Sequence, residues 1–526
     1  MTRIYLYDTT LRDGAQTVGV DFSLGDKQAI ALALDELGID MIEAGWPGTN
    51  PTDTAMFEDL PTLRHARFSA FGMTRRSGRS ASNDPGLNRV LSAAVGAVCL
   101  VGKTWDFHVT KALEISLAEN ISIISDSIAH ARSKIDEVLF DAEHFFDGYK
   151  CNPQFALQCV QAAADAGARW VVLCDTNGGT LPDEIERIVT EVAAVIPGER
   201  LGIHCHDDTG NAVANSLAAV RAGARQIQGT LNGLGERCGN ANLVSLIPTL
   251  MLKMGYELGV TQAGLTKLTR VSRLLDERLS RLPNTRAPYV GDSAFAHKGG
   301  LHASAVAKDS RSYEHIDPAR VGNVRHVVVS DQAGRANILA RLQELGITVD
   351  HRDSRIADLG DLVKARESAG YAYEGAGASF ELLARRLLDV GAPPEYFRLV
   401  NYRVLDERHE TADGDIETIS EATIDVEVEG ESFREVAQGN GPVDALNTAL
   451  RQALEPVFPA LRRVQLSDYK VRILTPEEGT RALTRVLIES KDTEGHRWST
   501  VGVAPNVIDA SYQALQDSLV YFLMRG

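Results

Sequence analysis

The sequence lacks segments that would place the protein in a membrane or direct it out of the cell. No apolar stretch approaches the roughly 20 residues that span a bilayer. The first residues, Met1 to Tyr5, run directly into a strand-like segment and show neither the basic nor the apolar region of a secretory signal. The six cysteines form neither a Cys-x-x-Cys pair nor a disulfide framework. We therefore expect a cytoplasmic protein.

The sequence also has few basic residues relative to its acidic ones. Its 54 lysines and arginines are outnumbered by 71 aspartates and glutamates, which gives a formal net charge of −17 at pH 7. Nucleic acids and anionic membranes are bound by basic surfaces, so we expect neither as the main partner. An anionic small molecule would need local arginine or lysine, a metal ion or a helix N-terminus.

Length and composition indicate a globular protein of several domains. Hydrophobic residues make up 44 % and charged residues 24 % of the 526 positions. A single hydrophobic core stops growing at roughly 250 to 300 residues, so more than one domain is expected. The residue pattern changes twice along the chain. It predicts a catalytic barrel over 1–255, a mainly helical region over 256–400 and an α+β domain over 401–526.

Up to about residue 255, short β-rich segments alternate with longer amphipathic helical segments, which is the pattern of βα units around a parallel sheet. Eight such units in this length predict an α/β fold of the TIM (β/α)8 type. A doubly wound open sheet, the alternative, usually carries a Gly-rich phosphate loop after its first strand, and none follows Asp8. The strands are expected over Ile4 to Asp8, Asp40 to Trp46, Arg67 to Gly72, Ala97 to Gly102, Glu137 to Glu143, Trp170 to Asp175, Leu201 to His206 and Arg225 to Leu231.

Polar residues gather at the carboxyl ends of these predicted strands. In a TIM barrel the carboxyl ends form one rim, and this rim carries the active site. We therefore expect the functional site among residues Arg12, Asp13, Glu43, Glu143, Asp175, Thr176, His204, His206, Asn232, Glu236 and Asn240.

The motif His204-Cys205-His206 ends the seventh predicted strand. Residues i and i+2 of a strand face the same side, so the two imidazoles are placed to bind one divalent ion. By itself the motif is equally consistent with two histidines on a surface strand. Its position on the predicted rim favours a metal-dependent enzyme.

The last region contains an internal repeat at an offset of 65 residues. The matched pairs include Gly430 with Gly495, Phe433 with Trp498, Val436 with Val501, and Asp444-Ala445 with Asp509-Ala510. Each copy predicts a β-hairpin unit followed by a helix, and together they predict a duplicated α+β domain. The seam between two such halves suits a small effector or a dimer contact; the alternative is that the repeat only builds a core.

Three separated motifs resemble the DRE-TIM metallolyase family. They are Asp8-Thr9-Thr10-Leu11-Arg12-Asp13-Gly14-Ala15-Gln16, His204-Cys205-His206-Asp207-Asp208, and Gly233-Leu234-Gly235-Glu236-Arg237-Cys238-Gly239-Asn240. Within this family the chain is similar to the 2-isopropylmalate, homocitrate and citramalate synthases over essentially its whole length. The resemblance implies an acyltransferase that condenses acetyl-CoA with a 2-oxo acid. It also implies a homodimer with an amino-acid effector at the duplicated regulatory domain.

The resemblance further implies roles for individual residues. A divalent metal, Mg, Mn or Zn, would be bound by one carboxylate, two imidazoles and one amide, from Asp13, His204, His206 and Asn240. The 2-oxo acid would be bound by Arg12, Gln16, Glu43 and Thr176, with Arg12 also stabilising the developing alkoxide. The residues acting on the acetyl group would be Glu143 together with His302 and Tyr313, the last two reaching in from the partner subunit.

Two segments, Lys103 to His108 and Glu143 to Lys150, resemble the citramalate branch, whose acceptor is pyruvate and whose product leads to isoleucine. Bulky side chains near the site would leave room for a methyl but not an isopropyl group, the candidates being Trp105, Phe107, Phe145 and Phe146. One methylene is worth only about 1 to 3 kcal/mol of discrimination. The alternatives are therefore 2-isopropylmalate synthase, homocitrate synthase, or a carbon-carbon lyase of the same superfamily.

Overall fold

In the computed structural model, residues 2–327, 334–410 and 416–526 are described. The chain divides into two compact units, residues 1–295 with 316–325 and residues 296–315 with 326–526. The helices that follow the barrel, up to Arg278, belong to the first unit. The domain boundaries expected near residues 255 and 400 stay a prediction.

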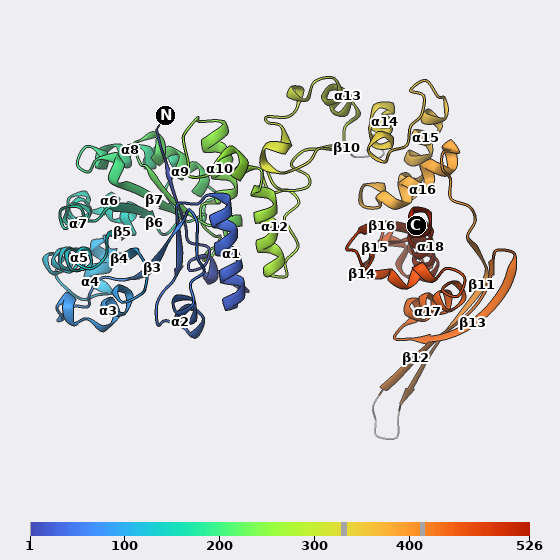
Figure 1. The fold of residues 1–526 in the computed structure, drawn as a ribbon, viewed down its shortest axis with the longest axis horizontal. Helices are drawn as coiled ribbons and strands as arrows, with labels where there is room; N and C mark the ends of the chain where they lie inside the picture. Colours follow the sequence, from blue (N-terminus) through green and yellow to red (C-terminus); the bar gives the residue numbers. More distant parts are fainter. Residues whose placement is uncertain (1, 328–333, 411–415) are drawn as a thin grey trace. The chain divides into compact units, whose positions relative to one another are not determined.

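The first unit contains a closed barrel of eight parallel strands in sequence order, with β1 beside β8 (Figure 1). The predicted TIM barrel is therefore confirmed. Its strands are β1 (Tyr5–Asp8), β2 (Met41–Gly45), β3 (Arg67–Met73), β4 (Ala97–Lys103), β5 (Glu137–Glu143), β6 (Trp170–Asp175), β7 (Leu201–Cys205) and β8 (Gln226–Gly229). The eighth strand is shorter than expected because the chain turns into a 3-10 helix at Leu231–Gly233.

Helices surround the barrel, and their first residues explain where several of them begin. Ser23 caps α1 and forms a capping box with Asp26, while Asn50 and Asn152 cap α2 and α7 just before a proline. The helices of this unit are α1 (Leu24–Leu37), α2 (Pro51–Glu58), α3 (Pro85–Leu91), α4 (Asp106–Lys111), α5 (Leu117–Arg132), α6 (Phe145–Cys151), α7 (Pro153–Asp165), α8 (Pro182–Ala193), α9 (Ala212–Arg221), α10 (Leu243–Leu252), α11 (Gln262–Leu265) and α12 (Leu268–Arg278).

The barrel strands bury both faces, as expected for parallel strands covered by helices. Alternate residues of neighbouring strands pack together in one cluster, including Phe71, Cys99 and Leu139. The residues between them, such as Val98 and Phe140, pack in the larger cluster with the surrounding helices. This packing fixes the strand ends that carry the polar rim.

The second unit begins with a short two-stranded sheet and helices, and ends with a duplicated α+β arrangement. Its elements are β9 (Ala296–His297), α13 (Gly300–Lys308), β10 (His326–Val327), α14 (Arg335–Glu344), α15 (Arg355–Ser368), α16 (Gly377–Leu388), β11 (Phe397–Glu410), β12 (Ile416–Val428), β13 (Glu431–Gly439), α17 (Pro442–Leu454), β14 (Gln465–Ile473), β15 (Thr484–Lys491), β16 (Arg497–Ala504) and α18 (Val507–Arg525).

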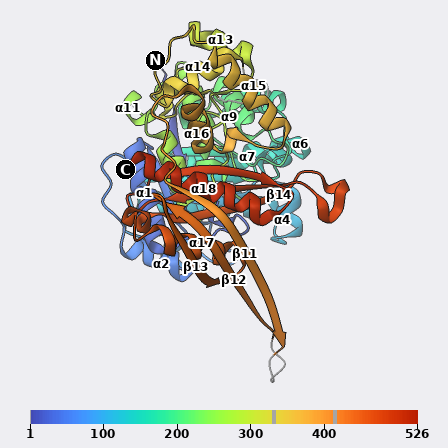
Figure 2. The ribbon, with the colours of Figure 1, turned by 90° about the vertical axis from the view of Figure 1, so that its right-hand side faces the viewer.

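The predicted duplication is confirmed by two three-stranded antiparallel sheets, β11-β12-β13 and β14-β15-β16, each followed by a helix. Helix α18 begins 65 residues after α17, and the matched Gly430 and Gly495 both turn their hairpins at positive φ. Residues of both helices share one hydrophobic cluster, among them Leu446 and Leu519. The β11-β12 hairpin extends well beyond α17 (Figure 2).

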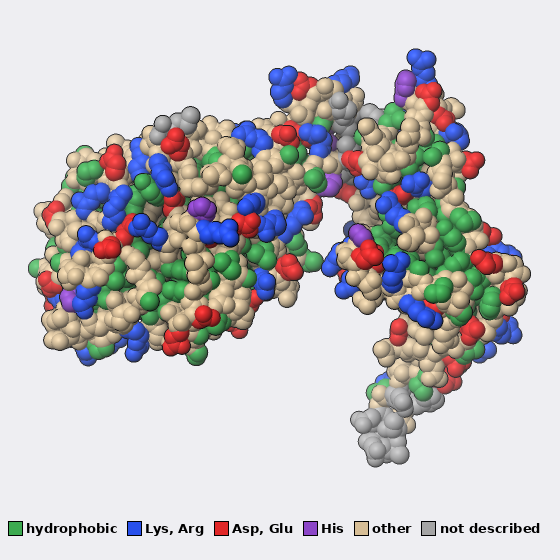
Figure 3. All heavy atoms as spheres, in the orientation of Figure 1, with side chains coloured by type: hydrophobic (Ala, Val, Ile, Leu, Met, Phe, Trp, Pro, Cys, Tyr) green, Lys and Arg blue, Asp and Glu red, His purple; other side chains and the backbone are tan. Residues whose placement is uncertain are grey.

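Charged side chains of both signs are interspersed over the visible face of the barrel unit (Figure 3). Along the part of the chain that the structure describes, no helix combines the length and apolar character needed to cross a membrane.

Candidate active site

The four predicted metal ligands come from three strand ends of the barrel and meet at its rim. Asp13 lies in the turn after β1, His204 in β7 and His206 directly after it, and Asn240 in the loop after β8. A backbone bridge pairs His206 with Asn240. The carboxyl ends of parallel strands therefore bring together residues far apart in sequence.

These side chains converge closely. His204 Nε2 lies 3.3 Å from Asp13 Oδ2 and 3.3 Å from His206 Nε2, and Asn240 Nδ2 lies 2.9 Å from Asp13 Oδ2. All four residues are buried. One donor atom from each of Asp13, His204 and His206 lies within 4.8 Å of the others. The arrangement is a candidate site for a divalent metal.

The donor set fits such an ion. A carboxylate, two imidazoles and an amide are ligands that Mg, Mn and Zn accept in proteins. Among the described residues, the buried Asn240 Oδ1 and His206 Nδ1 have no hydrogen-bond partner. A 180° flip of the Asn240 side-chain amide would exchange Oδ1 and Nδ2 and so present Oδ1 to the other donor atoms. The two orientations of an amide are distinguished only by their hydrogen-bond contacts.

A chain of hydrogen bonds orients His204. Its Nδ1 donates to Gln228 Oε1 at 2.8 Å, and Gln228 Nε2 donates to Asp141 Oδ1 at 2.9 Å. With Nδ1 bound to Gln228, Nε2 is the ring nitrogen that faces Asp13 and His206. Such outer contacts fix the tautomer of metal-binding histidines. Burial raises the pKa of Asp141 to about 6.

Charge and burial set the protonation of the donors. Burial by itself would raise the pKa of Asp13, but Arg12 and the two histidines hold it well below its usual range. Burial, with a smaller effect of His204, lowers the pKa of His206 to about 4. Burial lowers the pKa of His204, but the hydrogen bond and charge of Asp13 outweigh it and the net shift is upward. At neutral pH Asp13 is thus ionised and His206 is a neutral imidazole, so both can act as ligands.

Arg12 lies beside this cluster and is held on three sides. Its Nε donates to Glu43 Oε2 at 2.6 Å, its Nη1 lies 3.6 Å from Asp13 Oδ2, and its guanidinium stacks 3.9 Å from the ring centre of Phe71. Glu43 is fully buried and also accepts hydrogen bonds from Tyr7 and Thr9. Glu43 therefore orients Arg12. It is not among the residues that line the cavity beside the cluster, and its expected contact with the 2-oxo acid stays a prediction.

A cavity of about 310 Å³ opens over the cluster. Of the residues predicted to act on the substrates, Arg12, Gln16, Glu143 and Thr176 lie in its wall together with three of the candidate metal ligands. Thr176 Oγ1 accepts a hydrogen bond from the backbone N–H of His144 at 2.9 Å. The other wall residues are Trp46, Phe71, Met73, Val101, Lys103, Asp141, Cys174, Glu236 and Arg237.

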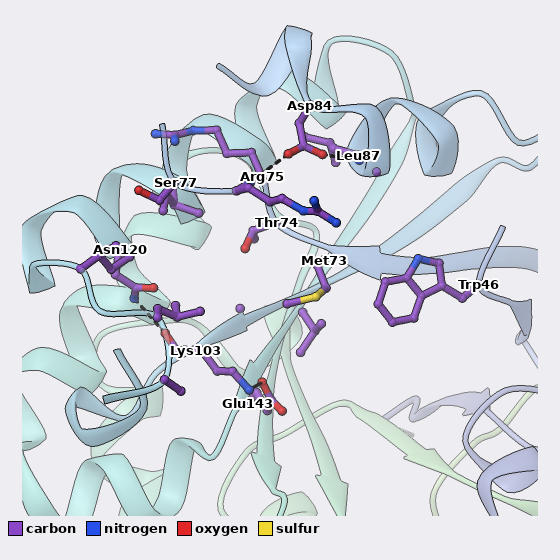
Figure 4. Close-up of a pocket in the computed structure, with 18 residues that line it drawn as sticks. Trp46, Met73, Thr74, Arg75, Ser77, Asp84, Leu87, Lys103, Asn120 and Glu143 are labelled. Atoms are coloured by element: carbon purple, nitrogen blue, oxygen red, sulfur yellow. Dashed lines mark hydrogen bonds and ion pairs between the residues drawn. The ribbon is translucent and has the colours of Figure 1, made fainter. Parts of the chain in front are cut away.

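A larger cavity of about 410 Å³ lies next to the first (Figure 4). The residues common to both walls are Trp46, Met73, Val101, Lys103 and Glu143. Lys103 Nζ lies 2.5 Å from Glu143 Oε2, an ion pair at the boundary of the two cavities. Sequence reasoning missed Lys103, although its place at the end of β4 is the signal that identified the other rim residues.

The four aromatic residues expected to narrow the pocket lie elsewhere. Phe145 and Phe146 are fully buried in the hydrophobic cluster of the barrel and its helices. Trp105 stacks with His108 and lies next to Phe107, which is half exposed. Within the described residues, none of the four lines either cavity. The bulky residues that do line the first cavity are Trp46, Phe71 and Met73.

His302 and Tyr313 lie in the second unit. Their rings stack with centres 4.1 Å apart, and both side chains are exposed. Nearby, His297 Nε2 lies 3.1 Å from Glu314 Oε1. Their role toward an acetyl group stays a prediction.

The glycine-rich loop after β8 has the backbone that the site requires. Gly235 and Gly239 both have positive φ, and a Cβ on Gly235 would lie 2.0 Å from Asn240 Oδ1. Arg237 spans from this loop to the rim and binds both oxygens of Asp208 at 2.8 Å. A larger residue at position 235 would displace the candidate ligand Asn240.

Comparison with known proteins gives matches along most of the chain. The family model described as HMGL-like matches residues 3–275, the one described as homocitrate synthase post-HMGL domain-like matches 289–367, and the LeuA allosteric (dimerisation) domain matches 374–523. The chain is 49 % identical to an (R)-citramalate synthase of Aquifex aeolicus, over 99 % of this chain and 98 % of that protein. It is 50 % identical to an (R)-citramalate synthase of Geobacter sulfurreducens, over 100 % and 98 % of the two chains. A probable 2-isopropylmalate synthase of Methanopyrus kandleri is 34 % identical over 97 % of each.

Proposed function

The chain belongs to the HMGL-like family and, within it, to the (R)-citramalate synthases, and we propose on this basis that it condenses acetyl-CoA with pyruvate to (R)-citramalate and coenzyme A. The full-length identity of 49 and 50 % with two enzymes of that name carries the proposal, because a probable 2-isopropylmalate synthase is only 34 % identical over a similar length. The rim of convergent donors beside Arg12 supports a reaction at a carbonyl group.

The reaction has two stages. A base removes a proton from the methyl group of acetyl-CoA, and the resulting carbanion attacks the ketone carbon of pyruvate. The electrons of the C=O bond pass to the ketone oxygen, which then takes up a proton. Water next attacks the thioester and releases coenzyme A as a thiol and the product as a dicarboxylate, which makes the overall reaction irreversible.

We propose that Arg12 stabilises the oxygen that gains charge. Glu43 and Phe71 hold its guanidinium beside the donor cluster at the cavity wall, so it needs little reorganisation when the charge develops. Gln16 and Thr176, also in this wall, are proposed to bind the carboxylate and ketone of the 2-oxo acid. The fork of donors on arginine suits this task better than the single ammonium of lysine.

Asp13, His204, His206 and Asn240 are proposed to hold a divalent ion, of which Mg, Mn and Zn are candidates. When bound, such an ion supplies Lewis-acid polarisation of the carbonyl group. The chain itself orients His204 through its contact with Gln228.

The groups that act on acetyl-CoA are proposed to be Glu143, His302 and Tyr313. Glu143 lies in the wall of both cavities and is paired with Lys103, which holds its carboxylate beside the reacting space. His302→Asn and Tyr313→Phe should each lower kcat while leaving metal binding by the barrel unchanged. Unaltered turnover in both variants would remove them from the reaction.

We further propose that the enzyme is a homodimer inhibited by isoleucine or leucine through residues 401–526, as the match to the LeuA allosteric (dimerisation) domain supports. Inhibition should disappear when this segment is removed, and inhibition that persists would place the effector elsewhere. Sedimentation of the intact chain measures the assembly.

The acceptor is identified by incubating the purified, metal-loaded enzyme with acetyl-CoA and one 2-oxo acid at a time. Free thiol release should be fastest with pyruvate, and chiral chromatography should give (R)-citramalate. A clear preference for 2-oxoisovalerate would instead identify a 2-isopropylmalate synthase, and a preference for 2-oxoglutarate a homocitrate synthase.

A further inference from the structure

A buried ion pair outside the reacting groups lies behind the cavity wall. Lys27 of α1 and Asp53 of α2 are only 2 and 6 % exposed, and Lys27 Nζ lies 2.5 Å from Asp53 Oδ1 and 3.4 Å from the carbonyl oxygen of Ala44. Lysine and aspartate are seldom buried unless paired. Because a buried pair is rarely more stabilising than apolar residues of the same volume, its presence suggests a geometric role.

The second oxygen of Asp53 holds the turn that leaves β2. Asp53 Oδ2 accepts the backbone N–H of Trp46 at 2.8 Å, while the backbone N–H of Asp53 donates to the Asn50 side chain at 2.7 Å. Gly45, which precedes Trp46, has a φ of +149°, and a Cβ there would lie 2.7 Å from Asp53 Oδ2. The turn from β2 to α2 is therefore folded tightly around this carboxylate.

Trp46 connects the turn to the reacting centre. Its indole lies in the wall of both cavities, next to Met73 (Figure 4). The ring packs edge-on against Phe71, with centres 5.4 Å apart and an angle of 78° between the planes. The Arg12 guanidinium in turn lies over the Phe71 ring, 3.9 Å from its centre. A continuous series of contacts thus runs from the buried pair to Arg12.

We propose that Lys27 and Asp53 are positioning residues that fix Trp46, and through Trp46 and Phe71 the place of Arg12. The proposal rests on the function proposed above for Arg12. Displacing a group that positions the reacting atoms by about 1 Å lowers turnover about 10²-fold. Loss of the pair should therefore affect catalysis more than folding.

Asp53→Asn and Lys27→Met test the proposal, with Asp35→Asn as a matched control. Asp35 lies on the same helix as Lys27 and is also a buried carboxylate. It binds backbone N–H groups at the opposite end of the barrel, before β3, from Arg64, His65 and Ala66. At a temperature where circular dichroism shows all three variants folded, the two variants of the pair should lose about 10²-fold in kcat, and the control should stay close to wild type. Equal activity in Asp53→Asn and Asp35→Asn would overturn the proposal.

Trp46→Ala provides an independent arm. If the pair acts through Trp46, the kcat of this variant should fall as far as that of Asp53→Asn. The double variant, Trp46→Ala with Asp53→Asn, should then have a kcat no lower than either single variant. Losses that multiply in the double variant would show that the pair acts by another route and would overturn the proposal. Should Asp53→Asn fail to fold, wild-type activity in Trp46→Ala would overturn it alone.

Fluorescence separates this inference from the proposed function. The chain has four tryptophans, so the contribution of Trp46 is the difference between wild type and Trp46→Phe. The emission of Trp46 should shift to longer wavelength in Asp53→Asn and Lys27→Met but not in Asp35→Asn. If the wild-type enzyme consumes no 2-oxo acid, the proposed function is wrong. The positioning role is tested separately, because an unchanged Trp46 emission in folded Asp53→Asn would overturn it whatever the activity.

Discussion

Replacing Arg12 by lysine preserves the positive charge and removes the fork of donors. In the structure Nε of Arg12 is bound to Glu43 at 2.6 Å, Nη1 lies 3.6 Å from Asp13, and the flat guanidinium stacks on Phe71 at 3.9 Å. A lysine ammonium is a single point that pairs with Glu43 or reaches into the cavity, but does not do both. Losing one preorganised donor to a developing oxyanion lowers kcat about 10²- to 10³-fold, or about 2.7 to 4 kcal/mol.

The assay is thiol release from acetyl-CoA at saturating pyruvate, combined with calorimetric titration of the metal-free protein with Mn²⁺. Arg12→Lys should bind the ion nearly as tightly as wild type, because none of the candidate ligands is changed. Thermal unfolding serves as the control for folding. A folded Arg12→Lys enzyme with wild-type kcat would refute the role of the guanidinium, and a loss of metal affinity equal to the loss of kcat would show that Arg12 acts only by supporting Asp13.

Three further predictions follow from the same geometry. His206→Ala removes one donor, so metal content by plasma mass spectrometry and activity should both be lost, and a fully active variant would contradict the metal assignment. Burial raises the pKa of Asp141 from 3.8 to about 6, so its contribution to stability is complete below pH 3.8 and is lost as the pH rises through 6. Above pH 6 the free energy of unfolding of metal-free Asp141→Asn should therefore exceed that of wild type by up to about 3 kcal/mol, and near pH 4 the two should be equal. A difference in Tm that does not change with pH would show that the raised pKa of Asp141 is not the cause. Met73 lines the cavity, so Met73→Ala should raise kcat/KM for 2-oxobutyrate relative to pyruvate by about 10- to 200-fold. Phe146 lies in the hydrophobic core, so Phe146→Ala should lower the free energy of unfolding by about 3 to 5 kcal/mol without changing that ratio.

The sequence was sufficient to predict the barrel and the residues at its rim. Alternating β-rich and amphipathic segments gave eight strands, of which β5 and β6 have the predicted bounds. Strand ends of a parallel barrel share one rim, so the pattern also predicted that Asp13, His204 and Asn240 would meet. Here local periodicity and overall topology agree.

Side-chain pairing across the barrel was not predictable in the same way. Glu43 was expected in the substrate pocket, and the sequence did not indicate that it would be fully buried and bound to Arg12. The aromatic residues after Glu143 were expected near the site because their segment resembles the citramalate branch. However, His144 adopts a left-handed conformation and α6 starts at once, which places Phe145 and Phe146 in the hydrophobic core. Sequence proximity does not fix direction where the backbone turns this sharply.

The candidate metal site also depends on how the barrel closes. Asp13 and Asn240 are 227 positions apart, and they meet only because β1 pairs with β8. A divalent ion shared by Asp13 and the ligands from β7 and the β8 loop would therefore join the two ends of the barrel. Since a ligand that binds only the folded state adds RT ln(1 + [L]/Kd) to its stability, the ion should stabilise this closing seam most. Metal binding and barrel closure are therefore thermodynamically coupled, because the donors do not form a site until β1 and β8 have paired.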